Sequence, residues 1–132
     1  SSGVNENNTI VSSRGLVGRV TEIGNKVSRG LLLSDISSRV PVSISSSEIQ
    51  GILIGQNLNR PKINYVKNLN DIKVGDLVVT SGKGGIFPSN LVVGSVAILD
   101  KKNQNIEVDL FVNPKSLSRV RIINYQIEIR IE

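Results

Sequence analysis

The sequence predicts an all-β protein built from two small β-barrel lobes. Three observations lead to this prediction: an aliphatic core composition, many short strand patterns between turn signals, and an internal repeat. The chain has 132 residues, of which 39% are apolar and 3% aromatic. Its core must therefore consist of Ile, Val and Leu, and residues branched at Cβ favour strands. The length allows one domain, or two very small ones sharing a core.

The first half of the chain contains several short strand patterns. They cover residues 16–23, 29–34, 40–44, 49–54 and 62–66, and a polar, turn-rich stretch covers 57–61. Gly24 and Asn25 signal a turn between the first two patterns. Pro41 lacks an N–H group, so we expect the strand around it to be an edge strand or to carry a bulge.

The second half continues in the same way. Strands are expected over 77–79, 92–99, 106–112 and 117–123, with a polar hairpin loop at 100–105. The tail alternates most regularly, because Ile127, Ile129 and Ile131 are separated by polar residues. Such alternation is typical of a half-buried strand, so we expect deletion of residues 126–132 to destabilise the fold. No window of 11 or more residues has a helical period, and many short strands indicate a sandwich or barrel.

An internal repeat suggests how the lobes arose. A glycine turn, a strand ending in small hydroxyl residues, a glycine corner and a G-x-V strand follow one another near Gly3–Val20 and again near Gly75–Val96. Loose similarity is common in any β-chain rich in Gly and Val, but here four features match in order, which favours duplication. We expect one lobe to comprise 1–36 with 106–132 and the other 37–105, with a boundary that can interleave.

Composition excludes several kinds of site. The chain has no Cys and no His, which rules out disulfides, zinc sites built on these residues and a His-based catalytic triad. The net charge is +5, but the basic residues are scattered, as on a solvated surface. No segment approaches the roughly 20 apolar residues of a membrane span. We expect no metal and no cofactor.

Residues 74–96 (VGDLVVTSGKGGIFPSNLVVGSV) form the most informative stretch. Its glycines are expected where the chain bends sharply or approaches another backbone. We expect the loop 82–90 to serve lobe packing or partner contact, with Phe87 as a plug at the corner. Asp76 is expected to bond the backbone of its own turn.

The residues of this stretch do not match the patterns of known catalytic or phosphate-binding sites. Ser81 and Lys83 could form a Ser–Lys dyad only if side chains two residues apart converged across Gly82. Asp71 and Asp76 bracket a turn instead of facing each other across a cleft. Gly82-Lys83 lacks the further Gly and the hydroxyl residue of a phosphate-binding loop, since positions 77 and 84 are Leu and Gly.

A nucleic-acid-binding barrel is the alternative function. Such barrels stack bases on aromatic side chains in a basic groove. The aromatic residues here are Tyr65, Phe87, Phe111 and Tyr125, which are far apart in the sequence and not interleaved with Lys or Arg. Charge and fold class still permit this function.

Several ordered motifs resemble the bacterial rod shape-determining protein family MreC. The central stretch is similar to the family pattern GD-x-V-x-TSG-x-GG-x-FP followed by a G-x-V strand, and residues 15–20 look like its GLVGRV strand. The resemblance covers about residues 3–117. Asn90 replaces a usual Gly, which Asn can do because it tolerates a left-handed backbone. The positions that match the family motif are Gly15, Gly18, Gly75, Asp76, Thr80, Ser81, Gly82, Gly84, Gly85, Phe87, Pro88 and Gly94.

The resemblance implies a non-catalytic scaffold of the cell-elongation machinery. It implies two barrels similar to those of trypsin but without a protease site, self-association, and contact with a class B penicillin-binding transpeptidase and other membrane proteins of the complex. Family members carry a transmembrane helix and a coiled coil before the β region. We therefore expect this chain to be the periplasmic (extracytoplasmic) part of an inner-membrane-anchored protein that does not bind nucleic acid.

Overall fold

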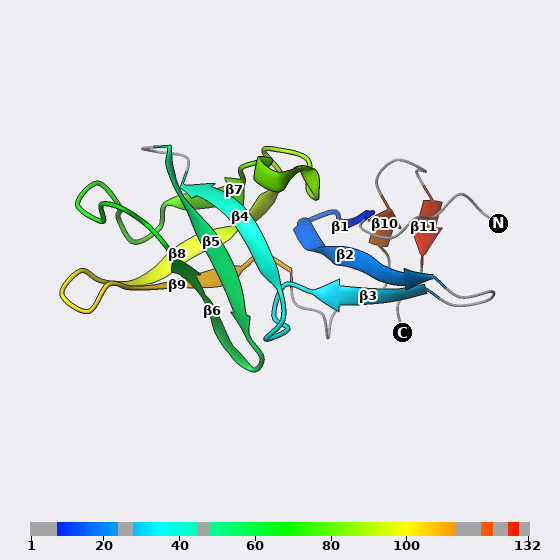
Figure 1. The fold of residues 1–132 in the computed structure, drawn as a ribbon, viewed down its shortest axis with the longest axis horizontal. Coiled ribbons are helices and arrows are strands. Elements are labelled where there is room, and N and C mark those ends of the chain that lie inside the picture. The colour runs from blue at the N-terminus through cyan, green and yellow to red at the C-terminus, as the bar shows by residue number, and fades with distance from the viewer. Residues whose placement is uncertain (1–7, 24–27, 45–47, 113–119, 123–126, 130–132) are drawn as a thin grey trace.

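The computed structural model describes residues 8–23, 28–44, 48–112, 120–122 and 127–129. Over these residues the chain forms eleven strands and one turn of 3-10 helix, so the all-β prediction is confirmed. The strands make a closed barrel and a separate sheet, which lie next to each other along the long axis of the molecule (Figure 1).

Six strands close the barrel. They are β4 (Arg39–Ile44), β5 (Ile49–Gln56), β6 (Asn59–Asn64), β7 (Leu77–Thr80), β8 (Val92–Asp100) and β9 (Asn105–Leu110). Their order around the barrel is β4-β5-β6-β9-β8-β7, and β7 pairs with β4 to complete the ring. The turn η1 (Lys83–Gly85) lies in the loop between β7 and β8. Closure leaves no free sheet edge along most of the ring.

The second unit is a five-stranded sheet in the order β11-β10-β1-β2-β3. Its strands are β1 (Thr9–Ser12), β2 (Gly15–Ile23), β3 (Ser28–Leu32), β10 (Val120–Ile122) and β11 (Ile127–Ile129). The predicted tail strand is thus present and pairs with β10, while Ile131 and the side chains of β11 lie outside the described residues.

One strand lies in a different unit from the one expected. The sequence pattern predicts that residues 106–132 belong to the first lobe, but β9 pairs with β8 and β6 and belongs to the closed barrel. The barrel is therefore one continuous segment, from β4 to β9. The sheet is discontinuous, because β10 and β11 return to it after the barrel is complete.

The two units contain equivalent three-stranded meanders, β1-β2-β3 and β7-β8-β9. In the first pair of each, Ile10 lies opposite Gly18 and Val78 opposite Gly94, and a register shift follows directly after Ile10 and Val78. In the second pair, a further shift comes after Val20 in β2 and after Val96 in β8. This agreement in pairing and bulges supports the predicted duplication.

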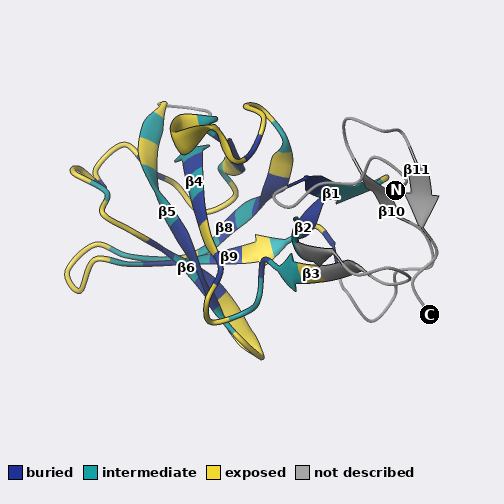
Figure 2. Ribbon diagram, turned by 45° about the vertical axis from the view of Figure 1, so that its right-hand side comes forward, coloured by how far each residue is buried: buried dark blue, intermediate teal, exposed yellow. Residues whose placement is uncertain are grey.

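The main core fills the barrel and extends into the sheet. Leu16 and Leu33 belong to the sheet unit, yet they are buried in the same cluster as the barrel residues Val42, Leu53 and Ile106. Figure 2 shows buried positions along the barrel strands and along β2, while the hairpin tips of the barrel are exposed. A smaller cluster joins Val17 and Val112. The two units therefore share apolar packing.

Two prolines lie within strands. The stretch 57–61 was expected to be a polar turn, but β6 begins at Asn59 and includes the buried Pro61. Proline is tolerated there because the register of β6 with β9 contains a single pair, Lys62 with Glu107. Pro41 pairs with Ile52 of β5, whereas β7 meets β4 only from Val42 onwards. The strand is therefore not at an edge, and the Pro41 carbonyl still accepts a hydrogen bond at 3.0 Å from the N–H of Ser81, the residue that follows β7.

Candidate functional site

The loop between β7 and β8 has a conformation that requires its glycines. Gly82, Gly84 and Gly85 have φ angles of 79°, 76° and 72°, a left-handed region that favours glycine. Asn90 has a φ of 65°, and asparagine is among the few other residues that adopt this conformation readily. The loop thus reverses direction several times within a short length.

Thr80 connects the two ends of this loop by hydrogen bonds. Its side chain is buried, and its hydroxyl donates a hydrogen bond to the Pro88 carbonyl at 2.5 Å while it accepts one from the Leu91 N–H at 2.9 Å. Its main chain bonds both Leu91 and Asn90. All the polar atoms of Thr80 are thereby used, as burial requires.

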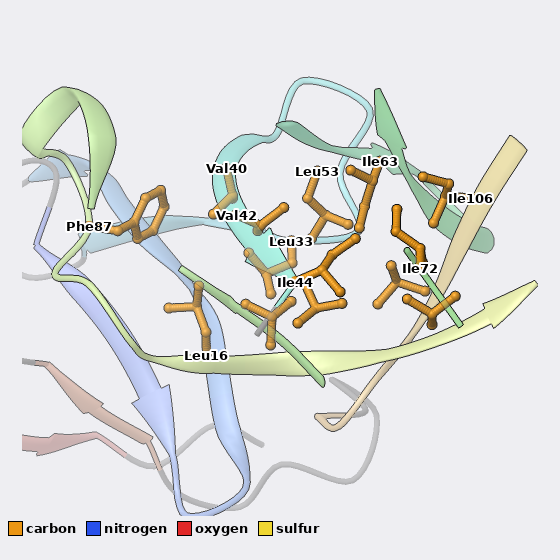
Figure 3. Packing of buried hydrophobic residues seen from close by; sticks show 14 of the residues in the cluster. Leu16, Leu33, Val40, Val42, Ile44, Leu53, Ile63, Ile72, Phe87 and Ile106 are labelled. Atoms are coloured by element: carbon orange, nitrogen blue, oxygen red, sulfur yellow. The ribbon is translucent and has the colours of Figure 1, made fainter. Parts of the chain in front are cut away.

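Phe87 anchors the loop in the shared core. Its side chain is 5% exposed and belongs to the cluster that contains Leu16. Figure 3 shows Phe87 and Leu16 at one end of this cluster, with Ile72 and Ile106 at the other. The predicted plug is therefore buried, while its neighbour Ile86 remains 42% exposed. The loop contributes to lobe packing through Phe87, and its outer side is left for other contacts.

Gly15, Gly18 and Gly94 lie where another backbone comes close. A Cβ atom on Gly15 would lie 2.7 Å from the carbonyl oxygen of Val92, so β2 touches β8 at the junction of the two units. On Gly18 and Gly94 it would lie 2.0 Å and 2.1 Å from carbonyl oxygens of the next strand. Such distances exclude any side chain unless the backbone moves.

Gly75 and Asp76 shape the turn that precedes β7. Gly75 has a φ of 93°, and the Asp76 carboxylate accepts a hydrogen bond from the Lys73 N–H at 2.8 Å. The Asp76 N–H in turn donates to the Lys73 carbonyl. The predicted backbone-bonding role of Asp76 is confirmed.

The arrangement does not assemble a Ser–Lys dyad. The Ser81 hydroxyl accepts a hydrogen bond from the main-chain N–H of Lys83 at 3.3 Å, which is a local turn contact. Lys83 lines a hollow with Tyr65 and Ile52, whereas Ser81 lines hollows with Thr9 and Ser43. Within the part of the chain that the structure describes, no group of three or more acidic side chains could hold a metal ion.

The described aromatic residues do not form a stacking platform. Phe87 is buried, Phe111 is 37% exposed, and Tyr65 is 80% exposed on a different loop. Tyr125 lies outside the described residues. The three described aromatic residues thus do not make the row of exposed rings that sequence-tolerant binding of single strands uses.

Sequence reasoning missed a groove on the outside of the barrel. It has a volume of about 540 Å³ and is lined by Pro41, Ile52, Tyr65, Lys67 and Lys83 among others. These residues come from β4, β5 and two separate loops, so no local pattern connects them. The exposed Tyr65 followed by Lys67 was the one available signal.

A family model described as "Rod shape-determining protein MreC, barrel core" matches residues 1–124. The chain is 40% identical over 124 residues to the cell shape-determining protein MreC of Caulobacter vibrioides, which covers 94% of this chain and 35% of that protein. The chain spans about a third of the length of the curated relatives it matches. In the described residues no helix is both long and apolar enough to cross a membrane.

Solved structures have the same fold. One is described as the major periplasmic domain from the cell shape-determining filament MreC, with a TM-score of 0.72 and 27% identity over 84% of this chain and 73% of that one. Another is the MreC of Helicobacter pylori in complex with a Penicillin-Binding Protein (PBP2), with a TM-score of 0.67 and 22% identity, covering 83% and 73% of the two chains. At that identity the second likeness shows the fold alone.

Proposed function

This chain belongs to the MreC family of rod shape-determining proteins, and from this premise we propose that it is a non-catalytic scaffold of the bacterial cell-elongation complex. In this role it maintains rod shape by organising peptidoglycan synthesis through protein–protein contacts. The observation that carries the proposal is the match of the family's barrel core to residues 1–124, together with a fold that the solved members share.

The geometry of the motif residues supports a structural role. Thr80, Phe87 and Gly15 hold the loop and the two units against one another. A scaffold needs surfaces at fixed relative positions, and a shared apolar core supplies such rigidity. Ser81 and Asp76 form local turn bonds, and a chain without His or Cys lacks the usual nucleophile–base pairs. The proposed role needs no cofactor.

We propose the extracytoplasmic part of a class B penicillin-binding transpeptidase as the main partner. The support is family membership, together with the solved complex of a family member with a Penicillin-Binding Protein (PBP2). Other membrane proteins of the elongation complex and further copies of this chain are proposed as additional partners. The solved relative described as part of a filament supports self-association.

The proposed location is the periplasm, on a protein anchored in the inner membrane. The similar solved domain is described as periplasmic, and the matching relatives are about three times as long as this chain. The extra length of those relatives leaves room for the anchoring helix and coiled coil that the proposal requires.

A binding titration against the extracytoplasmic domain of the same bacterium's elongation transpeptidase tests the proposal. We expect saturable binding at both low and high salt. An interaction that appears only with nucleic acid, and that weakens steeply with salt, would instead favour the nucleic-acid-binding barrel, because phosphate contacts release counterions. No binding by a chain lengthened to include its coiled coil would refute the scaffold assignment, since lengthening restores avidity.

Two variants locate the partner surface within the same titration. Ile86 is the exposed apolar residue of the β7–β8 loop, and Ile86→Ser should weaken binding if this loop contacts the partner. Leu58, at the tip of the β5–β6 hairpin, is 96% exposed and provides a matched control. If Leu58→Ser weakens binding and Ile86→Ser does not, the partner binds the opposite part of the barrel and the loop has a packing role alone.

A further inference from the structure

The groove on the barrel's outer face has an apolar floor. Pro41 of β4 and Ile52 of β5 lie directly opposite each other in the register, and both are half-buried. Their neighbours Val40, Val42 and Leu53 point into the core, so the Pro41–Ile52 pair faces outwards. The volume of about 540 Å³ lies within the usual range of ligand sites.

Tyr65 forms one side of this groove in an unusual backbone conformation. It directly follows the last residue of β6, has a φ of 64°, and exposes 80% of its surface. A bulky residue rarely adopts a left-handed conformation, because its Cβ comes too close to the backbone. Such outliers gather at functional sites, where the surrounding structure maintains them. Here the outlier turns the chain away from β5 where the β5–β6 register ends, at Ile52 with Asn64.

Two lysines lie at the sides of the groove. Lys67 follows Tyr65 in the same loop, and Lys83 comes from η1. Neither forms an ion pair with a described residue, unlike Arg60, which binds Asp109 at 2.6 Å. Among the described residues that line the groove, Glu48 has the one carboxylate against two lysines, so this lining carries an excess of positive charge. The whole chain has the same sign, with a net charge of +5.

We propose that this groove binds a short linear peptide segment of a partner protein, in which apolar side chains are flanked by acidic ones. The apolar side chains would cover Pro41 and Ile52 and contact the Tyr65 ring, while carboxylates would pair with Lys67 and Lys83. Aromatic anchors with charges at the rim are the usual composition of such sites. The proposal depends on the scaffold function only for the identity of the protein that carries the segment.

Synthetic peptides test the site without that protein. The probe is the acetylated, amidated hexapeptide Asp-Glu-Leu-Leu-Glu-Asp, and the controls replace either its acidic residues with Lys or its leucines with Gly. We expect saturable binding of the probe alone, followed by NMR, with shifts at 49–52, 65–68 and 83–84. Affinity should fall several-fold at high salt, because exposed charges are screened.

A charge-reversal variant provides the sharpest control. Lys67→Glu with Lys83→Glu should lose at least about tenfold in affinity for the acidic probe and gain affinity for the Lys peptide. Lys102→Glu changes the same charge on the exposed β8–β9 hairpin and should leave binding unchanged. If Lys102→Glu lowers the affinity for the probe as much as the double variant does, the peptide is attracted by the overall charge of the protein and the site assignment fails.

Tyr65→Gly separates recognition from folding. Glycine adopts a φ of 64° without strain, so this variant should melt at the same temperature as the parent or higher. It should nevertheless no longer bind the probe. A variant that keeps full affinity would overturn the proposal. The proposal would also be overturned if the probe did not bind at millimolar concentration. Selective binding of an N-acetylglucosamine tetramer instead of the probe would overturn it too, because the groove would then be a glycan site. A negative result here leaves the transpeptidase titration unaffected.

Discussion

Gly18 and Gly94 occupy the same position in two equivalent meanders, and each lies against a carbonyl group of the strand that follows. Gly18 faces the Leu31 carbonyl and Gly94 the Asp109 carbonyl, at 2.0 Å and 2.1 Å from where a Cβ would be. Each meander also has an equivalent hydrogen bond next to its glycine. The Leu33 N–H donates to the Val17 carbonyl and the Phe111 N–H donates to the Val93 carbonyl, both at 3.1 Å. The same local requirement thus selects glycine twice.

The first prediction concerns this pair of glycines. Gly18→Ala and Gly94→Ala should each destabilise the fold by about 2 kcal/mol or more, because a methyl group would overlap a carbonyl oxygen. Gly84→Ala is the control: its Cβ would meet nothing within 4 Å, and only a φ of 76° opposes it, at about 1 kcal/mol. Urea unfolding measures all three. Equal losses at Gly84 and Gly94 would contradict the close approach.

The second prediction concerns Thr80. Thr80→Val keeps the shape of the side chain but removes the hydroxyl, leaving the Pro88 carbonyl and the Leu91 N–H without their partner. We expect a loss of about 1–3 kcal/mol in the free energy of unfolding. Thr80→Ser retains both bonds and loses one methyl group, at about 0.8 kcal/mol. The melting temperature of Thr80→Val should therefore be lower than that of Thr80→Ser. The reverse order would show that the packing of the methyl group contributes more to stability than the hydrogen bonds of the hydroxyl.

The third prediction concerns the plug of the β7–β8 loop. Phe87→Ala removes a buried ring from the cluster shared by both units and should cost about 3–5 kcal/mol of stability. The adjacent exposed Ile86→Ala should change stability by no more than about 0.5 kcal/mol. If the Phe87 variant folds with normal stability and binds like the parent, Phe87 has neither a packing nor a partner role.

The fourth prediction concerns pH and the β8–β9 hairpin. The pKa of Asp100 is lowered mainly by the side-chain amide of Asn103, which donates a hydrogen bond to the Asp100 carboxylate at 2.8 Å. The Asn103 main-chain N–H donates a second hydrogen bond to this carboxylate and lowers the pKa further. Because this pKa is depressed in the folded state, the stabilisation is present above the ordinary carboxyl pKa and disappears as pH falls through the lowered value.

Asn103→Ala should therefore raise the pKa of Asp100 towards its ordinary value in an NMR titration. Lys102→Ala keeps the backbone donors of the turn and should not change it. The stability difference between the Asn103 variant and the parent should be present at neutral pH and vanish in acid. A difference that persists unchanged in acid would mean that the amide acts on the turn and not through the carboxylate.

The sequence predicted most strands because their signals are local. Alternation of apolar residues identified β9, and glycine turns bounded β7 and β8. The start of β6 was missed because Asn59 and Pro61 have turn propensities that pairing with β5 overrides. Strand membership in the barrel was misjudged for β9, since pairing partners are a long-range property that no local pattern encodes.

The candidate site divides in the same way. The positive φ angles of Gly82 and Gly85, and the turn bond of Asp76, follow from the chemistry of single residues. The outer groove depends on β4, β5 and two distant loops meeting, and Tyr65 has a conformation contrary to its residue type. Neither could be inferred before the barrel was known.

The order of strands along the chain has a consequence for folding kinetics. All six barrel strands are contiguous, so the ring can close as soon as β9 has been synthesised, whereas the sheet must wait for β10 and β11. During that interval, of the two described strands that pair with β1, only β2 is present, and the side of β1 that later pairs with β10 still waits for this partner. Leu16 and Leu33 can already occupy the barrel core at this stage, which would hold the unfinished sheet beside the ring and shield it from pairing with other chains.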